Sequence, residues 1–313
     1  MSEPALHQKE DSSAAPSLPA SSLILCSRNR PKLLFECVSS ILQGEELPTE
    51  LLIIDDSDSR HDRLSSLTTT ARGCEVRYLW TRSVGLSRAN NDGIAAARSN
   101  VLVFTQDDAL VSPTWFGAIV RALVEAGQRS VVTGQVLPSE PETSGAFAPS
   151  TTADLVPAVY EGRINKDVLF AQNMAMYRFV VEEVGYFDKG LGPGTPFPGA
   201  EDNDFGLRLL EAGYRILYVP QAVVYHRAWR SKSDYLPLHW NYGRGQGAYY
   251  AKYLSLQDRY MLQRMIRDVL YHLGQAPRRL WRRQPYRILS DAVYVLGVLS
   301  GATEWLWTQR RTR

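Results

Sequence analysis

Hydrophobic residues in the first half of the chain fall into short unbroken runs separated by longer amphipathic stretches. Four such runs occupy residues 23–26, 51–54, 76–80 and 101–104. Apolar runs of this length are typical of strands that are covered on both faces, as in a parallel sheet. The pattern therefore predicts an α/β fold, with a mostly parallel central sheet flanked by helices.

The stretches between the runs carry helix signals at their ends. Pro31 suits a first helical turn, and Gly44 suits the C-terminal cap of the same helix. Further on, Ser112 and Pro113 are expected to open a second helix, which Gly127 ends. The alternation of these helices with the apolar runs indicates strand-helix-strand units.

The pattern also predicts where the chain divides. A Pro-, Ser-, Thr- and Gly-rich stretch is expected to be a mobile loop at residues 138–152. Regular elements then resume, with a short strand at 169–176, helices at 179–184 and from residue 200, and a strand from 214 that leads toward His226. The expected parts are a disordered tail over 1–20, an α/β domain over 21–229 with halves 21–110 and 111–229, and a helical extension over 230–313.

Composition excludes several classes of protein. The 313 residues carry a net charge of only +2, so no overall field favours nucleic acid. The charge is uneven, because residues 278–313 hold eight arginines against two acids. Cys26, Cys37 and Cys74 are an odd number without metal-ligand spacing, which indicates reduced core residues and a cytoplasmic location. No stretch reaches the length of a membrane span.

Acidic pairs follow two of the predicted strands. Asp55 and Asp56 come after the second run, and Asp107 and Asp108 come after the fourth. In open α/β sheets ligands bind outside the carboxyl ends of the strands, so both pairs are expected to face one crevice. Four carboxylates together need a divalent cation or a ligand rich in polar hydrogens. For Asp55 and Asp56, a role in an ordinary turn is an equal alternative.

Two further candidates lie later in the chain. Glu201 and Asp202 begin an amphipathic helix, directly after the loop GLGPGTPFPG. Helix N-termini favour acids anyway, but glycine- and proline-rich loops on rigid scaffolds often shape binding sites. His226 follows an apolar run, where a structural histidine is the ordinary interpretation. With a carboxylate nearby, its imidazole would suit Mn²⁺ or a similar ion.

Seven segments in order resemble the family 2 glycosyltransferases of GT-A fold. The resemblance covers about residues 22–227 and rests on LILCSRNRPKLLFECVSSIL, ELLIIDDSDS, VGLSRANNDGIAAA, VLVFTQDDAL, AQNMAMYRFVVEEVGYFD, GPGTPFPGAEDNDFGLRLLEAGYRILYVP and AVVYHR. It implies an enzyme that moves a sugar from a nucleoside diphosphate sugar, with UDP-sugars favoured, to a glycan or lipid-linked acceptor. It also implies a divalent metal cofactor, Mn²⁺ or Mg²⁺, and inversion at the transferred carbon.

The resemblance also implies roles for individual residues. Asp202 would be the general base, with Glu201 beside it. Asp108 and His226 would hold the metal. The implied donor-binding residues are Arg28, Asp55, Asp56, Arg88 and Asp107. Gln106 stands where many members carry an acid, so the division of labour between the two neighbouring aspartates is open.

The C-terminal third allows two interpretations at each of two places. HWNYGRGQGAYYAKYL, from residue 239, either closes over a substrate or is a glycine-marked helix start that packs its tyrosines on the main domain. Residues 276–311 mix Arg with Trp and Tyr, which favours peripheral contact with the inner face of the cell membrane. A helical cap on the domain or a contact in an oligomer is the alternative.

Sequence features oppose three other classes of protein. A nicotinamide oxidoreductase needs GxGxxG after its first strand, where this chain has CSRNRP. A sugar nucleotidyltransferase needs a glycine-rich basic loop at the same place, and here Arg28 and Arg30 supply charge without the glycines. A catalytically silent, membrane-docked nucleotide-sugar scaffold is opposed by the joint presence of Asp108, Asp202 and His226.

Overall fold

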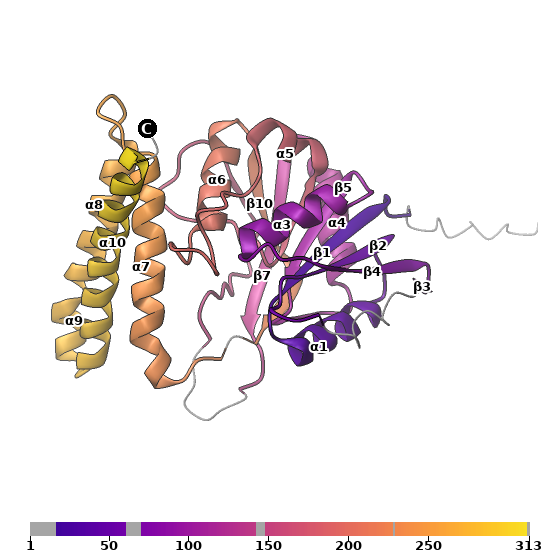
Figure 1. The fold of residues 1–313 in the computed structure, drawn as a ribbon, viewed down its shortest axis with the longest axis horizontal. Coiled ribbons are helices and arrows are strands. Elements are labelled where there is room, and N and C mark those ends of the chain that lie inside the picture. The colour runs from indigo at the N-terminus through magenta and orange to yellow at the C-terminus, as the bar shows by residue number, and fades with distance from the viewer. Residues whose placement is uncertain (1–16, 61–69, 142–147, 228, 312–313) are drawn as a thin grey trace, which may run out of the picture.

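One ten-stranded sheet organises the protein, with helices on both of its faces (Figure 1). The computed structural model describes residues 17–60, 70–141, 148–227 and 229–311. The strands are β1 (Ser21–Ser27), β2 (Glu50–Asp55), β3 (Thr70–Ala71), β4 (Cys74–Trp80), β5 (Val101–Gln106), β6 (Ala109–Val111), β7 (Ser130–Pro138), β8 (Ala158–Tyr160), β9 (Met174–Tyr177) and β10 (Arg215–His226). They lie in the order β3-β4-β2-β1-β5-β9-β7-β10-β6, and β8 also pairs with β10.

The long strands pair in parallel, as the apolar runs predict. β1 lies between β2 and β5, β2 also pairs with β4, and β7 pairs with β10, all in parallel. The short strands β3, β6, β8 and β9 pair antiparallel, so the sheet is mixed. Of the strand predicted over 169–176, only the end is a strand: β9 begins at Met174 and lies antiparallel between β5 and β7.

Helices cover the two faces of the sheet, and a further group at the C-terminus stands beside it. They are α1 (Pro31–Leu42), α3 (Leu86–Ala96), α4 (Trp115–Ala126), α5 (Arg178–Val184), α6 (Glu201–Glu211), the 3₁₀ turn η1 (Lys232–Asp234), α7 (Tyr235–Lys252), α8 (Tyr260–Gly274), α9 (Ala276–Trp281) and α10 (Pro285–Arg311). Alternate residues of β1 serve opposite faces. Leu23 and Leu25 pack with α1 and α4, whereas Ile24 and Cys26 pack with α3, α5 and α6. Burial on both faces explains why residues 23–26 of β1 form an unbroken apolar run.

Two predicted helix ends are wrong in detail. α4 begins at Trp115 rather than at Pro113, because the Trp115 amide donates to the Ser112 carbonyl at 3.0 Å and closes a turn first. At the end of α1 the cap position is Gln43, and Gly44 follows it with its amide on the Ile41 carbonyl. The other end of α4 is as predicted.

The structure also bears on the cysteines, on membrane spans and on the segments expected to be mobile. The three cysteines are buried and free, as predicted. Within the part of the chain that the structure describes, no helix combines the length and hydropathy that a bilayer crossing requires. Residues 1–16 of the expected tail and 142–147 of the expected mobile loop lie outside the described residues.

Glycines let α7 and α10 pack unusually close together. The four C-terminal helices stand beside the α/β domain, and α7 is the nearest to it (Figure 1). A Cβ added at Gly247 of α7 would lie 2.0 Å from the Val298 carbonyl oxygen, and one at Gly301 of α10 would lie 2.1 Å from that of Arg244. The GRGQG pattern therefore belongs to the interior of α7, not to its start. Its glycines provide a close helix contact.

The Gly247→Ala variant is expected to lower the free energy of unfolding by about 1–3 kcal/mol. Alanine gains roughly 0.5–1 kcal/mol of helix preference, but its methyl group would overlap the Val298 backbone, which cannot move without separating the helices. The matched control is Gly274→Ala at the end of α8, where an added Cβ meets no atom within 4 Å. Chemical unfolding of both variants tests this, and equal stability of Gly247→Ala and wild type would contradict it.

Candidate active site

A cavity of about 1030 Å³ lies at the carboxyl ends of β1, β2, β5 and β10. It continues along α7, α8 and α10. Six of the residues that the sequence singled out line it, namely Arg28, Asp56, Asp108, Glu201, Asp202 and His226. Three others do not: Asp55 and Asp107 are buried behind it, and Arg88 lies on the exposed side of α3. The fold thus brings together acids from β2, β5 and α6 with the histidine of β10.

Arg30, which the sequence did not single out for this site, joins the acidic pair after β5. Its guanidinium contacts Asp107 Oδ1 at 2.5 Å and Asp108 Oδ2 at 2.7 Å. Ser27 donates a hydrogen bond to Asp107 Oδ2 at 2.7 Å. Burial raises the pKa of Asp107 to about 7, even though Arg30 opposes the shift. Burial opposes the ionisation of Asp108 too, but contacts with His226 and Arg30 hold its pKa below the usual value.

His226 faces Asp108 across a short gap. Its Nδ1 lies 3.1 Å from the Pro149 carbonyl oxygen, which can only accept, so Nδ1 carries a proton. Its Nε2 then points to Asp108 Oδ1 at 3.7 Å. That carboxylate oxygen is buried and has no hydrogen-bond partner among the described residues. A fixed imidazole tautomer and an unsatisfied carboxylate oxygen are the features of a site that fits a divalent cation.

The described residues contain no group of three or more His, Cys, Asp or Glu side chains arranged for a metal ion. The protein would therefore offer two ligands, Asp108 and His226, with other positions open. Catalytic metal sites keep such positions for substrate or water.

Asp55, the last residue of β2, and Asp56, which follows it, have different surroundings. Asp55 accepts hydrogen bonds from Ser57 and, at 2.6 Å, from the Tyr78 hydroxyl, so it holds the turn. Asp56 lines the cavity and accepts from the Gly85 amide at 2.9 Å. Burial raises the pKa of Asp56. The turn interpretation therefore fits Asp55, and the site interpretation fits Asp56.

The glycine-proline loop before α6 also packs on the start of α3. The Leu86 amide donates to the Pro193 carbonyl, and a Cβ at Gly194 would lie 2.9 Å from the Gly85 Cα. Ala200 at the end of the loop has a positive φ of 65°, a strained conformation for a residue with a side chain. This backbone directs the start of α6 into the cavity.

Glu201 and Asp202, the first two residues of α6, form an acidic pair in which Glu201 is buried and Asp202 is partly buried. Burial raises the pKa of Glu201 to about 7. Burial also raises the pKa of Asp202, and the neighbouring carboxylates of Glu201 and Asp167 raise it further. A raised pKa makes the ionised carboxylate a stronger base.

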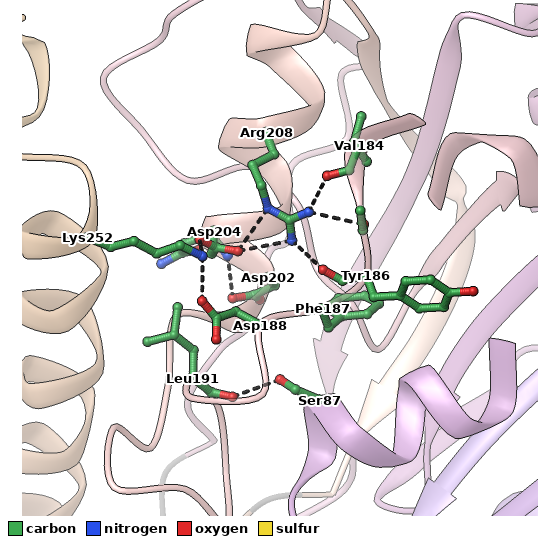
Figure 2. Close-up of polar contacts among 12 residues, drawn as sticks. Ser87, Val184, Tyr186, Phe187, Asp188, Leu191, Asp202, Asp204, Arg208 and Lys252 are labelled. Atoms are coloured by element: carbon green, nitrogen blue, oxygen red, sulfur yellow. Dashed lines mark hydrogen bonds and ion pairs between the residues drawn. The ribbon is translucent and has the colours of Figure 1, made fainter. Parts of the chain in front are cut away.

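Asp204, one helical turn into α6, has a different function. Its carboxylate contacts Lys252 at 2.6 Å, Arg208 at 3.0 Å and the Tyr253 hydroxyl at 2.7 Å. Figure 2 shows Lys252 reaching from α7 to both Asp204 and Asp188. This fully paired acid fixes α6 to α7 and does not line the cavity.

Near pH 8 the Glu201→Gln variant is expected to be more stable than wild type, by on the order of 1–3 kcal/mol. The Glu201 carboxyl ionises near 4.5 when unfolded and near 7 when folded. Between these values the folded state binds more protons, so this group's contribution to stability falls as the pH rises. Thermal unfolding at several pH values should show a difference that shrinks toward pH 5. The control is the exposed Glu182→Gln, and an absence of any difference near pH 8 would contradict the prediction.

Comparisons with known proteins identify first the fold and then the family. The mannosyltransferase PcManGT from Pyrobaculum calidifontis, solved with GDP-Man and Mn²⁺, is similar with a TM-score of 0.59 and 16% identity over 96% of this chain and 91% of its own. TarS residues 1–349 from S. aureus, solved with UDP, gives a TM-score of 0.54 and 13% identity over 92% of both chains. The fold is that of GT-A glycosyltransferases, as predicted.

A third solved structure supports the same fold, and a sequence profile identifies the family. GalNAc-T7, solved with UDP, GalNAc and Mn²⁺, gives a TM-score of 0.53 and 19% identity over 68% of this chain, which spans 44% of that protein. No curated protein matches the sequence. The sequence profile of glycosyl transferase family 2 matches residues 22–183, more than half of the chain. The chain therefore belongs to glycosyl transferase family 2, and it is an enzyme of glycosyl transfer.

Proposed function

We propose that the protein transfers a sugar from a nucleoside diphosphate sugar to an acceptor hydroxyl, with inversion and with a divalent metal. One observation carries this proposal: a single cavity holds the Asp108–His226 pair at one place and the acidic pair of α6 at another. The structural relatives solved with GDP-Man or UDP support a nucleotide-linked donor. Among donors, we propose a UDP-sugar first.

Donor binding is proposed for the part of the cavity at the ends of β1 and β2. Asp56 and Arg28 line it, and the Arg28 guanidinium lies 3.8 Å from the Asp56 carboxylate. Asp55 and Asp107 support this part from behind, because their carboxylates are taken up by neighbouring hydroxyls and Arg30. Arg88 does not line the cavity, so the proposal gives it no donor contact.

Asp108 and His226 would hold the metal, Mn²⁺ or Mg²⁺, through Oδ1 and Nε2. Bound there with the donor's diphosphate, it would offset the negative charge that develops as the nucleoside diphosphate leaves. Arg30 orients the Asp108 carboxylate by holding its other oxygen at 2.7 Å. The tautomer of His226 is set by the Pro149 carbonyl.

Asp202 would accept the proton of the acceptor hydroxyl, with Glu201 beside it. The acceptor oxygen forms a bond to the anomeric carbon while the bond from that carbon to the diphosphate oxygen breaks, and both electrons of that bond leave with the diphosphate. The hydroxyl proton moves to the Asp202 carboxylate. A single displacement opposite the leaving group needs no enzyme nucleophile and inverts the configuration. The raised pKa of Asp202 suits this proton transfer.

We propose the two halves 21–110 and 111–229 as the donor half and the metal and acceptor half, with 230–313 as a helical extension. α7 and α8 of this extension line the part of the cavity beyond Asp202, where the acceptor, a glycan or lipid-linked sugar, would bind. In a nucleotidyltransferase a glycine-rich loop would follow β1, whereas here Arg28, Asn29 and Arg30 lead directly into α1.

Thermal unfolding and donor hydrolysis test the proposal together. Nucleoside diphosphates should raise the melting temperature more with Mn²⁺ than without it. A panel of UDP-, GDP- and dTDP-sugars should then show slow hydrolysis of one donor. Stabilisation without hydrolysis of any donor would favour a catalytically silent nucleotide-sugar scaffold. A rise in melting temperature that is the same with and without Mn²⁺ would contradict the metal site.

A further inference from the structure

The outer end of the cavity carries positive charge without acidic partners. Its acids are already paired: Asp167 contacts Arg264, and Asp268 accepts hydrogen bonds from the hydroxyls of Tyr250 and Tyr294. Two further arginines line the cavity, Arg230 before η1 and Arg267 on α8. Among the described residues, no carboxylate lies within ion-pair distance of either one. The cavity therefore offers two arginines without acidic partners to an anion.

The same helix presents an apolar row to solvent. Leu262, Ile266, Leu270 and Leu273 are spaced so that they share one side of α8, and between 36% and 61% of each side chain is exposed. Leu280 and Trp281 of α9 are exposed by 69% and 83%. We call these six residues the α8–α9 face. Apolar exposure on this scale marks an interaction surface.

The apolar row and the cavity lie on different sides of α8, and Arg267 lies between them. Arg267 and Tyr271 line the cavity and are also exposed, and their positions on the helix adjoin those of the row. Figure 1 shows α8 and α9 on the side of the molecule away from the sheet. Whatever covers the α8–α9 face therefore lies close to the outer end of the cavity.

The charges near the α8–α9 face indicate what kind of partner covers it. Every exposed charged side chain on the described parts of α8 to α10 and their connections is an arginine. Those around the α9 part of the face are Arg278, Arg282, Arg283 and Arg287. The acid Asp291 is buried and paired with His272 and Arg279. Two copies meeting through this face would oppose like charges, whereas a bilayer with anionic lipids supplies both an apolar interior and negative charge.

We propose that the α8–α9 face docks on an anionic bilayer, and that the outer end of the cavity receives an acceptor anchored in that bilayer through a phosphate or diphosphate group. Arg230 and Arg267 bind the anionic group, and its lipid chain passes along the apolar row of α8. The acceptor half of this proposal rests on the proposed function, whereas the docking half does not.

Sedimentation with vesicles tests the docking half. The protein should bind vesicles of phosphatidylcholine with phosphatidylglycerol, bind phosphatidylcholine alone much more weakly, and lose binding as salt is added. Arg282→Gln combined with Arg283→Gln should weaken binding by roughly 30-fold. Leu280→Ser combined with Trp281→Ser should weaken it at least as much, and the control Val124→Ser, exposed on α4, should not.

Three outcomes would overturn the docking half. They are an absence of binding to anionic vesicles, equal binding by the Leu280→Ser and Trp281→Ser variant, and a dimer in light scattering that the same variant dissociates. The last result would assign the face to a second copy of the chain. Because vesicle binding needs no sugar transfer, its failure leaves the proposed function standing.

Farnesyl diphosphate tests the acceptor half. Its binding is measured by calorimetry with Mn²⁺ and UDP at saturation, so that the donor end is filled. Arg230→Gln and Arg267→Gln should each weaken this binding about tenfold and leave the weaker binding of farnesol unchanged. Unchanged affinity of both variants for farnesyl diphosphate would overturn the acceptor half. A protein that binds none of UDP, GDP and dTDP would instead contradict the proposed function.

Discussion

Replacing Asp202 with asparagine is expected to reduce the kcat of sugar transfer by about 10²–10⁴-fold. Asparagine keeps the shape of the side chain and its contact with the Asn203 amide, but it cannot accept the proton of the acceptor hydroxyl. Because burial already disfavours the charged carboxylate, the neutral variant should fold at least as well as wild type. Affinity for nucleoside diphosphate, measured by calorimetry with Mn²⁺, should stay within a few-fold.

The control for this variant lies in the same helix. Asp204→Asn weakens the contacts with Lys252 and Arg208, so it should lower the free energy of unfolding while the folded enzyme keeps its kcat. Near-normal turnover by Asp202→Asn would remove Asp202 from the role of base. A loss of turnover in both variants at temperatures where both are folded would show that α6, and not one carboxylate, is what matters.

The Asp108→Ala variant is expected to lose both metal-dependent nucleotide binding and transfer, with kcat/KM reduced by about 10²-fold or more. It removes the buried Oδ1 that faces His226 Nε2 at 3.7 Å. Arg30 keeps its contact with Asp107, so the end of β5 retains a charge partner. Thermal unfolding with UDP should show that added Mn²⁺ no longer raises the melting temperature.

His226→Gln provides the matched test of the same site. If both residues hold one cation, each single variant should remove most of the Mn²⁺ effect, and the double variant should be hardly worse than either. The exposed Glu182→Ala should keep the full effect. A Mn²⁺ effect of wild-type size in Asp108→Ala would contradict the assignment.

The strands were predictable because their burial is extreme. β1, β2 and β5 are covered on both faces, so each contains an unbroken run of four apolar residues, and this signal does not depend on distant partners. The carboxyl ends of those strands then place Asp56 and Asp108 in one cavity by topology alone. His226 and Asp202 could be predicted to lie at the edge of the sheet because a strand end and a helix start are marked in the sequence, and both line the cavity.

Features that depend on partners far along the chain were not predictable. The glycines of α7 are explained by α10, about 50 residues later, which no local pattern reports. Arg30 looks like an ordinary residue before a helix until the fold brings it to Asp107 and Asp108. Asp55 and Asp56 look alike in sequence. Only the fold shows that Asp55 accepts hydrogen bonds from Ser57 and from Tyr78 of β4, whereas Asp56 lines the cavity.

The central claim is that Asp108, after β5, and His226, at the end of β10, bind one cation together with the donor's diphosphate. A crystal structure of the protein soaked with Mn²⁺ and UDP, with anomalous scattering recorded for manganese, tests it most directly. We expect a single manganese peak between Asp108 Oδ1 and His226 Nε2, with diphosphate oxygens completing its shell. Manganese and nucleotide bound elsewhere, with this corner empty, would contradict the account.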